Sequence, residues 1–442
     1  MKDQLTRIDA IAVPAERLAA LIELDQSHPR LFGVKLRLGE LYISFGQLDL
    51  GSVYLAEAHR LRGERGVSRD EARAATLEYG RVLILRRTPS EAIPVVMAAA
   101  RAGDPAALLV RASAFLQSGN IKGGVADFRA AFAAKGVTPS AADFTLYAQA
   151  LAADGQYSDA LAVLRDCEQR LGYQPGTGLL ESSILEKLRR AAESILAAFK
   201  ETLYQQTQGT ITADQVDKNL TVLAGRTDVS GVADPRTQMI VKGLKAYLHG
   251  QWAEASADLV KGLAGLDDPF GRFLLLSCGL EKDKVTAGSL TDFIALESRF
   301  RGYPDFYYRL WRAMKKGPGD YSLTNMRSVL EKTILLAPVS VEAQETRVEL
   351  GRLLGMEPAE AKSILLRPEL DLAFARLAAG EDPAKVLPPV LRLLSVSREN
   401  LYTSDGVLML RSAARIPAVR AFLAEQARQA SGPMKDRLSQ LL

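Results

Sequence analysis

Cysteine is scarce in this 442-residue chain, and long apolar runs are absent. Cys167 and Cys278 each lie within an apolar helical pattern, so we expect two small buried side chains; a disulfide or a shared metal ion is the alternative. No run of about 18 apolar residues occurs, which argues against a transmembrane helix. Residues 1–21 lack the uninterrupted apolar core of a signal peptide. The cytoplasm is therefore favoured, and a periplasmic or lipid-anchored location would require a leader that this sequence does not show.

The motifs of common enzyme sites are also missing. The chain has no G-x-x-x-x-G-K-[ST] phosphate loop, no H-E-x-x-H, no C-x-x-C and no G-x-S-x-G. Its three histidines lie far apart in the sequence, so only folding could bring them together as metal ligands. A net charge of +4 is small for this length and argues against a dedicated nucleic-acid binder. We expect no catalytic residues, cofactor, metal or nucleic-acid partner; an enzyme with convergent carboxylates in a cleft stays open as an alternative.

Helical periodicity runs through the whole chain, and no alternating strand pattern competes with it. Two stretches, 106–131 and 141–167, align with a spacing of 36 residues. Small residues are required where the two helices of a pair touch, bulky residues fill the groove beside them, and glycine ends the first helix in a left-handed conformation. The aligned positions are Ala112 and Ala148, Gly119 and Gly155, Gly124 and Ala160, Phe128 and Leu164, and Ala131 and Cys167.

This pattern resembles the tetratricopeptide repeat (TPR). The resemblance is clearest over 28–63 and 106–170, looser over 70–104, where Arg87 replaces the turn glycine, and over 237–265. It implies an all-α solenoid of helix–turn–helix repeats that holds other proteins.

The helical patterns and a change in composition predict three parts. Residues 1–205 form an N-terminal TPR-like array, and its segment 180–206 reads as one long helix. Residues 206–236 form a polar connecting segment with a short helix. Residues 237–442 form a second array, degenerate after about 270, so the chain has two stacked or hinged arrays.

In TPR arrays the first helix of each pair lines the concave face, so the resemblance identifies candidate partner-binding residues. The alternative is that several of them only pack against the next repeat. Family members that bind chaperones present Lys and Asn there as a carboxylate clamp, and this sequence departs from that pattern. The candidates are Leu36, Glu40, Ile43, Leu77, Arg81, Ile84, Leu109, Ser113, Gln149, Leu244 and Tyr247.

A further candidate surface is 299–316, RFRGYPDFYYRLWRAMKK, where six aromatic residues fall within 300–311 among basic ones. On a helix starting near Asp305, Tyr307, Tyr308 and Trp311 share one face, and Arg312 lies beside them. Tyr, Trp and Arg are typical of interface hot spots. A repeat core with extended arginine stems, a membrane surface and single-stranded nucleic acid remain the other interpretations.

Together these patterns predict a non-enzymatic scaffold or adaptor that binds peptides or helices of unidentified partner proteins in a concave groove. Membrane contact would be peripheral. The usage of Ala, Leu and Arg suggests a bacterial protein, and the resemblance implies a role in an envelope, secretion or motility assembly. The alternative function is a solenoid that binds a small apolar or saccharide ligand between its two halves.

Overall fold

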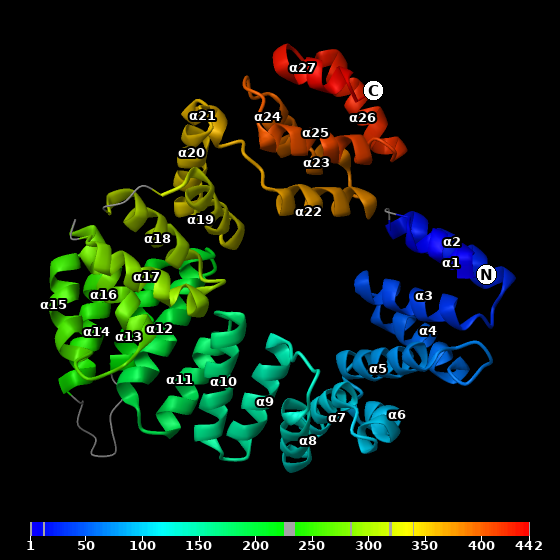
Figure 1. The fold of residues 1–442 in the computed structure, drawn as a ribbon, viewed down its shortest axis with the longest axis horizontal. Helices are drawn as coiled ribbons and strands as arrows, with labels where there is room; N and C mark the ends of the chain where they lie inside the picture. Colours follow the sequence, from blue (N-terminus) through cyan, green and yellow to red (C-terminus); the bar gives the residue numbers. More distant parts are fainter. Residues whose placement is uncertain are drawn as a thin grey trace. The chain divides into compact units, whose positions relative to one another are not determined.

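The computed structural model describes residues 2–11, 14–224, 235–282, 285–317, 321–338 and 340–441, and all the regular structure in them is helical (Figure 1). The predicted all-α class is therefore confirmed. Two compact units divide the chain: the first unit is Met1–Gln156 with Ala375–Asp382, and the second unit is Tyr157–Phe374 with Pro383–Leu442. Among the described helices, none is long and apolar enough to cross a membrane.

Helices follow one another in the first unit with short connections. They are α1 (Lys2–Asp9), α2 (Pro14–Ser27), α3 (Phe32–Ser44), α4 (Leu48–Leu61), α5 (Arg69–Leu85), α6 (Pro89–Arg101), α7 (Pro105–Gln117), α8 (Ile121–Ala133) and α9 (Ala141–Ala153).

The second unit begins at α10, and α22 runs across the division. The helices are α10 (Tyr157–Leu171), α11 (Thr177–Lys187), α12 (Ala191–Thr207), α13 (Ala213–Ala224), α14 (Pro235–Leu248), α15 (Trp252–Gly262), α16 (Pro269–Glu281), α17 (Ala287–Phe300), α18 (Pro304–Lys316), α19 (Leu323–Leu336), α20 (Val341–Leu353), α21 (Pro358–Ala361), α22 (Arg367–Ala378), α23 (Pro383–Val386), α24 (Pro388–Leu394), α25 (Leu401–Ala413), α26 (Pro417–Gln429) and α27 (Gly432–Ser439).

The polar segment 206–236 contains α13, so its predicted short helix is present. Residues 225–234 of that segment lie outside the described residues. The domain boundary that the sequence analysis places in this segment stays a prediction. The compact units of the structure divide the chain at Gln156.

Small residues bring the helices of a pair into close contact, as the repeat pattern predicts. A Cβ atom on Gly39 of α3 would lie 2.6 Å from the Cγ of Leu55 in α4, and one on Gly51 would lie 3.1 Å from the carbonyl oxygen of Gly39. The turn glycines Gly46 and Gly119 have φ angles of 75° and 81°, which is the left-handed region. The predicted role of Gly119 as a turn residue is confirmed, and Gly39, Gly46 and Gly51 fit the same repeat pattern.

The prediction of one long helix over 180–206 is wrong. The chain ends α11 at Lys187 and restarts α12 at Ala191, with Arg189 at a φ of 60° in the turn. The two helices then fold back on each other, and the Ser182 and Ser194 hydroxyls hydrogen-bond across the contact at 2.9 Å. Apolar periodicity missed this turn because neither glycine nor proline marks it. Arg87 is likewise a non-glycine residue in a turn of this kind and has a φ of 62°.

Helix α12 is the centre of the second unit. Nine consecutive residues, Ser194 to Thr202, are buried, and α11, α13, α14, α16 and α18 all pack against this helix. Helix α17 also returns to contact α10. A helix buried on every side is expected to be apolar all round, yet α12 carries Lys200 and Glu201 in this buried run.

The 299–316 segment lies mainly in the core. Phe300, Tyr303, Phe306, Tyr307 and Trp311 are all at most 6% exposed, and the rings of Phe300 and Phe306 stack at 5.4 Å. The structure therefore supports the core interpretation of this segment over the surface ones.

Both cysteines are free and buried, as expected. Burial raises the pKa of the Cys167 and Cys278 thiols to about 11.

Candidate functional site

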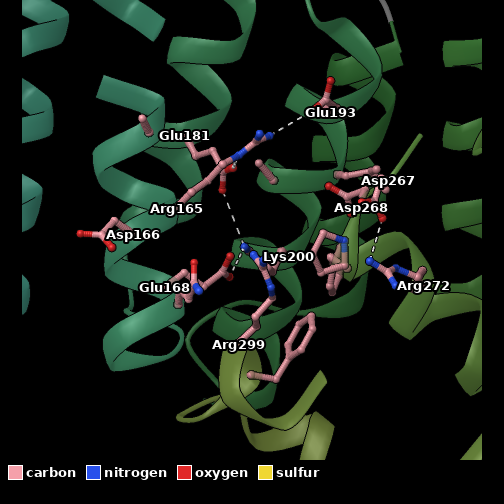
Figure 2. A pocket seen from close by; sticks show the side chains of 17 residues that line it. Arg165, Asp166, Glu168, Glu181, Glu193, Lys200, Asp267, Asp268, Arg272 and Arg299 are labelled. Atoms are coloured by element: carbon pink, nitrogen blue, oxygen red, sulfur yellow. Dashed lines mark hydrogen bonds and ion pairs between the residues drawn. The ribbon is translucent and has the colours of Figure 1, made fainter. Parts of the chain in front are cut away.

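A cavity of about 450 Å³ lies within the second unit, and we call it the charged cavity (Figure 2). Helices α10, α11, α12, α16 and α17 and the residues before α16 contribute its lining. Six of the lining residues are acidic and four are basic, which leaves an excess of two carboxyl groups. They are Asp166, Glu168, Glu181, Glu193, Asp267 and Asp268, and Arg165, Lys200, Arg272 and Arg299.

Lys200 of α12 is the most deeply placed of these charges. Its ammonium reaches between two carboxylates, with Nζ at 2.7 Å from Glu168 Oε1 and 3.7 Å from Glu181 Oε2 (Figure 2). The residue is 6% exposed, and its Nζ also lies 5.7 Å from the ring centre of Tyr173. Burial alone would lower the pKa of Lys200, but the attraction of Glu168 and Glu181 outweighs it, so the pKa is raised. The lysine therefore stays charged inside the unit.

The carboxyl groups around Lys200 are crowded. Burial raises the pKa of Glu181 above its ordinary value, and the negative charge of Glu168 adds to this effect. Burial likewise raises the pKa of Asp268, although its Oδ1 accepts a hydrogen bond from the Gly271 N–H at 2.7 Å as the N-cap of α16. The cavity thus favours added positive charge near these two groups.

At the edge of the cavity the charges are exposed and exchangeable. Asp267 is 89% exposed and Arg272 is 59% exposed, and they form an ion pair at 2.7 Å. Exposed pairs of this kind contribute little stability, so a partner could replace them with pairs of its own. No group of three potential metal ligands occurs in the described part of the chain.

The structure places the predicted partner-binding residues in two classes, and their role in partner binding stays a prediction. Eight are buried in the chain's own packing: Leu36, Leu77, Leu109, Ser113, Leu244, Tyr247, Tyr307 and Trp311. Seven are half-buried or exposed: Glu40, Ile43, Arg81, Ile84, Gln149, Tyr308 and Arg312. Three of the second class have partners within the chain, since Arg81 pairs with Glu78, Arg312 with Glu281, and Tyr308 donates to Glu345.

None of these predicted residues lines the charged cavity. Of the helices that build the cavity, α10 lies in the region of clear repeat pattern, α11 and α12 were predicted as one helix, and α16 and α17 lie in the degenerate region after about 270. One signal in the sequence could have revealed it. Lys200 and Glu201 interrupt the apolar run of α12, and charged residues are rarely buried among apolar ones unless they are paired. An Asp-Pro pair is a typical helix start, and α16 begins at Asp268-Pro269.

No protein-family description and no curated protein sequence matches this chain. Several solved structures align with it at low identity. A complex of Naa15 and Naa10 bound to HypK-THB is 14% identical over 98% of this chain and 75% of that chain, with a TM-score of 0.28. The C-terminal part of a TPR repeat-containing protein from Cytophaga hutchinsonii is 14% identical over 75% and 98%, with a TM-score of 0.20.

The hetero-tetramer of Cut9 and Hcn1 from the APC/C is 11% identical over 96% of this chain and 92% of that chain, with a TM-score of 0.28. Superpositions at such TM-scores carry no argument about function. The helical-repeat class of this chain rests on the packing of its own helices.

Proposed function

We propose that this chain is a non-enzymatic scaffold that binds partner proteins, with the charged cavity of the second unit as a docking site. The observation that carries the proposal is a cavity lined by ten charged side chains in a helical-repeat unit. Lys200 and its two carboxylates lie deep in the cavity and are held in place by burial. Asp267 and Arg272 at the edge are exposed, so a partner can replace their ion pair with new ones.

The exposed residues of the first unit extend the proposal. Glu40, Arg81 and Gln149 are the exposed members of the predicted concave set, so a partner would meet their side chains first. The setting implied by the family resemblance is a bacterial envelope, secretion or motility assembly, and the identity of the partner decides this.

The test compares two arginines of equal exposed fraction at different locations. Arg272 at the cavity and Arg367 on α22 are each 59% exposed, and each pairs with an aspartate. A photo-crosslinking residue replacing Arg272 should capture a defined partner, identified by mass spectrometry, and the same residue replacing Arg367 should not.

The purified partner then allows a quantitative comparison. Arg272→Glu should weaken its binding by about tenfold or more, because reversal of an interfacial charge costs over 1 kcal/mol, and Arg367→Glu should leave it unchanged. Equal capture at both positions, or unchanged binding by Arg272→Glu, would overturn the cavity as the docking site.

The second candidate function, binding of a small apolar or saccharide ligand, is favoured by one observation: another cavity of the second unit is lined by Tyr247 and Trp252. This function predicts that a purified small molecule raises the unfolding temperature without any protein partner.

A further inference from the structure

A second cavity, of about 420 Å³, lies at the C-terminal end of α12, and we call it the α12 cavity. Side chains from the α14–α15 region, from α18 and from the start of α20 complete it. The residues that matter below are Gln206, Tyr247, Trp252, Asp305, Arg309 and Glu342. All belong to the second unit.

Two polar atoms of this lining are buried without a hydrogen-bond partner among the described residues: Gln206 Oε1 and the Tyr247 hydroxyl. Tyr247 is only 3% exposed. Ser277 donates its own proton to the Phe273 carbonyl at 2.8 Å, and its oxygen remains available to accept the Tyr247 proton. Buried polar groups are nearly always paired in folded proteins, so Gln206 Oε1 indicates a missing donor.

The charges of the α12 cavity are unequal. Arg309, its basic residue, is 11% exposed and already committed to Asp305 Oδ2 at 3.0 Å and Glu281 Oε1 at 3.2 Å. The Glu342 carboxylate forms no ion pair with any residue that the structure describes. Gln206 Oε1 and Glu342 are therefore acceptors that await a donor, and a positively charged donor suits them best.

Two aromatic side chains of the α12 cavity already contact a cation. The guanidinium of Arg309 lies 5.3 Å from the ring centre of Tyr247 and 5.5 Å from that of Trp252, and the two rings meet edge to face at 5.2 Å. Rings of this kind attract cations through their electron-rich faces.

We propose that the α12 cavity binds the guanidinium or ammonium group of an arginine or lysine side chain on a partner protein, with Gln206 Oε1 and the Glu342 carboxylate as its acceptors. This site is separate from the charged cavity, so each proposal can fail without the other. An anion would meet Asp305 and Glu342, and a neutral sugar would leave the excess carboxylate unpaired.

The chain's two tryptophans make the test specific. Trp252 lines the α12 cavity and Trp311 does not, so the Trp311→Phe variant leaves Trp252 as the only indole. The probes are Nα-acetyl-arginine amide, Nα-acetyl-lysine amide and the neutral isostere Nα-acetyl-citrulline amide. We expect a saturable change of Trp252 fluorescence with the two cations, with a dissociation constant on the order of 1 mM, and none with citrulline.

Variants of the acceptors sharpen the assignment. Glu342→Gln should weaken arginine binding about tenfold and Gln206→Glu should strengthen it several-fold, since each changes one charge at the bound cation. Glu349→Gln, elsewhere on α20, is the matched control and should have no effect. If Trp311→Phe does not fold, 5-fluorotryptophan labelling of the natural chain gives one fluorine NMR signal per indole.

Four results would overturn the proposal. They are no saturable change with either cation, equal binding of citrulline, saturable binding of N-acetylglucosamine in place of the cations, and binding of spermidine more than about tenfold tighter than capped arginine. The last would assign the cavity to a free polyamine instead of a protein side chain.

Discussion

Among the described residues of each unit, one lysine is buried between two carboxylates and against a tyrosine. In the first unit, Lys35 Nζ lies 2.9 Å from Asp25 Oδ1, 2.7 Å from Glu57 Oε2 and 5.1 Å from the Tyr54 ring. In the second unit, Lys200 makes the corresponding contacts with Glu168, Glu181 and Tyr173. The same local arrangement thus occurs in two different surroundings.

The surroundings separate a structural ion cluster from a candidate site. The side chain of Glu57 is 36% exposed, so water shares in the Lys35 cluster. Glu168 and Glu181 are 18% and 16% exposed, and further charges extend their cluster into a cavity. A buried lysine with two carboxylates is therefore no sign of function by itself; the additional unbalanced charge around Lys200 is what distinguishes it.

The largest expected effect comes from removing these lysines. Lys200→Met leaves Glu168 and Glu181 without their buried counter-charge, so the free energy of unfolding should fall by about 3 kcal/mol. Lys35→Met should cost only about 1 kcal/mol, because Glu57 can be solvated. Both tryptophans, Trp252 and Trp311, lie in the second unit, so urea unfolding followed by fluorescence reports on Lys200→Met, and far-UV circular dichroism reports on Lys35→Met.

A loss of equal size in both variants would remove the distinction between the two clusters. The double substitution of Glu168→Gln with Lys200→Met is the control, since it relieves part of the remaining carboxylate repulsion and should recover part of the loss.

Helix pairs could be predicted from the sequence wherever two small residues lie 12 positions apart on either side of a glycine turn. Gly39 with Gly51 and Ala112 with Gly124 follow this rule, and the structure shows the close contacts. Ser182 and Ser194 have the same spacing and the same contact, yet this repeat was missed. Serine is not an obvious contact residue, and the intervening turn uses Arg189, so helical periodicity continued across it.

The candidate site was less predictable for a physical reason. Its charged residues come from α10 to α17, which folding brings together, and helical spacing only reports neighbours within one helix. The family resemblance located the first-helix residues, of which Tyr247 alone lines one of the two cavities. In the sequence, the one sign of this site was the pair of charged residues Lys200 and Glu201 among the apolar positions of α12, because buried charges require partners.

Two of the chain's Asp-Pro helix starts, one chosen from each unit, extend the comparison to pH. Asp104 caps α7, and its hydrogen-bonded pair with Arg73 lowers its pKa; Asp268 caps α16, and burial raises its pKa. Asp104→Asn should cost about 1 kcal/mol at neutral pH, a loss that disappears as the pH falls below about 4 through the lowered pKa.

Asp268→Asn keeps the cap and removes a destabilised charge. It should therefore raise the free energy of unfolding by up to about 1 kcal/mol at neutral pH, a gain that disappears as the pH falls through the raised pKa. Urea midpoints measured across this pH range check both signs, and effects of the same sign in the two variants would contradict the assigned environments.

The smallest expected effect concerns the turns themselves. Gly119 in the first unit and Arg189 in the second both occupy the left-handed region, with φ angles of 81° and 60°. A Cβ atom on Gly119 would meet nothing within 4 Å, so Gly119→Ala tests the backbone alone and should cost about 1 kcal/mol. Arg189→Gly should stabilise by only about 0.5 kcal/mol, because glycine relieves the strain but adds freedom to the unfolded chain.

The measurement is the urea midpoint, followed by circular dichroism for Gly119→Ala and by tryptophan fluorescence for Arg189→Gly. The Arg189 side chain is exposed, so its loss should cost no packing. A lower midpoint for Arg189→Gly would mean that the guanidinium makes a stabilising contact. In that case Arg189 would stabilise the second unit through its side chain, in addition to taking the place of a turn glycine.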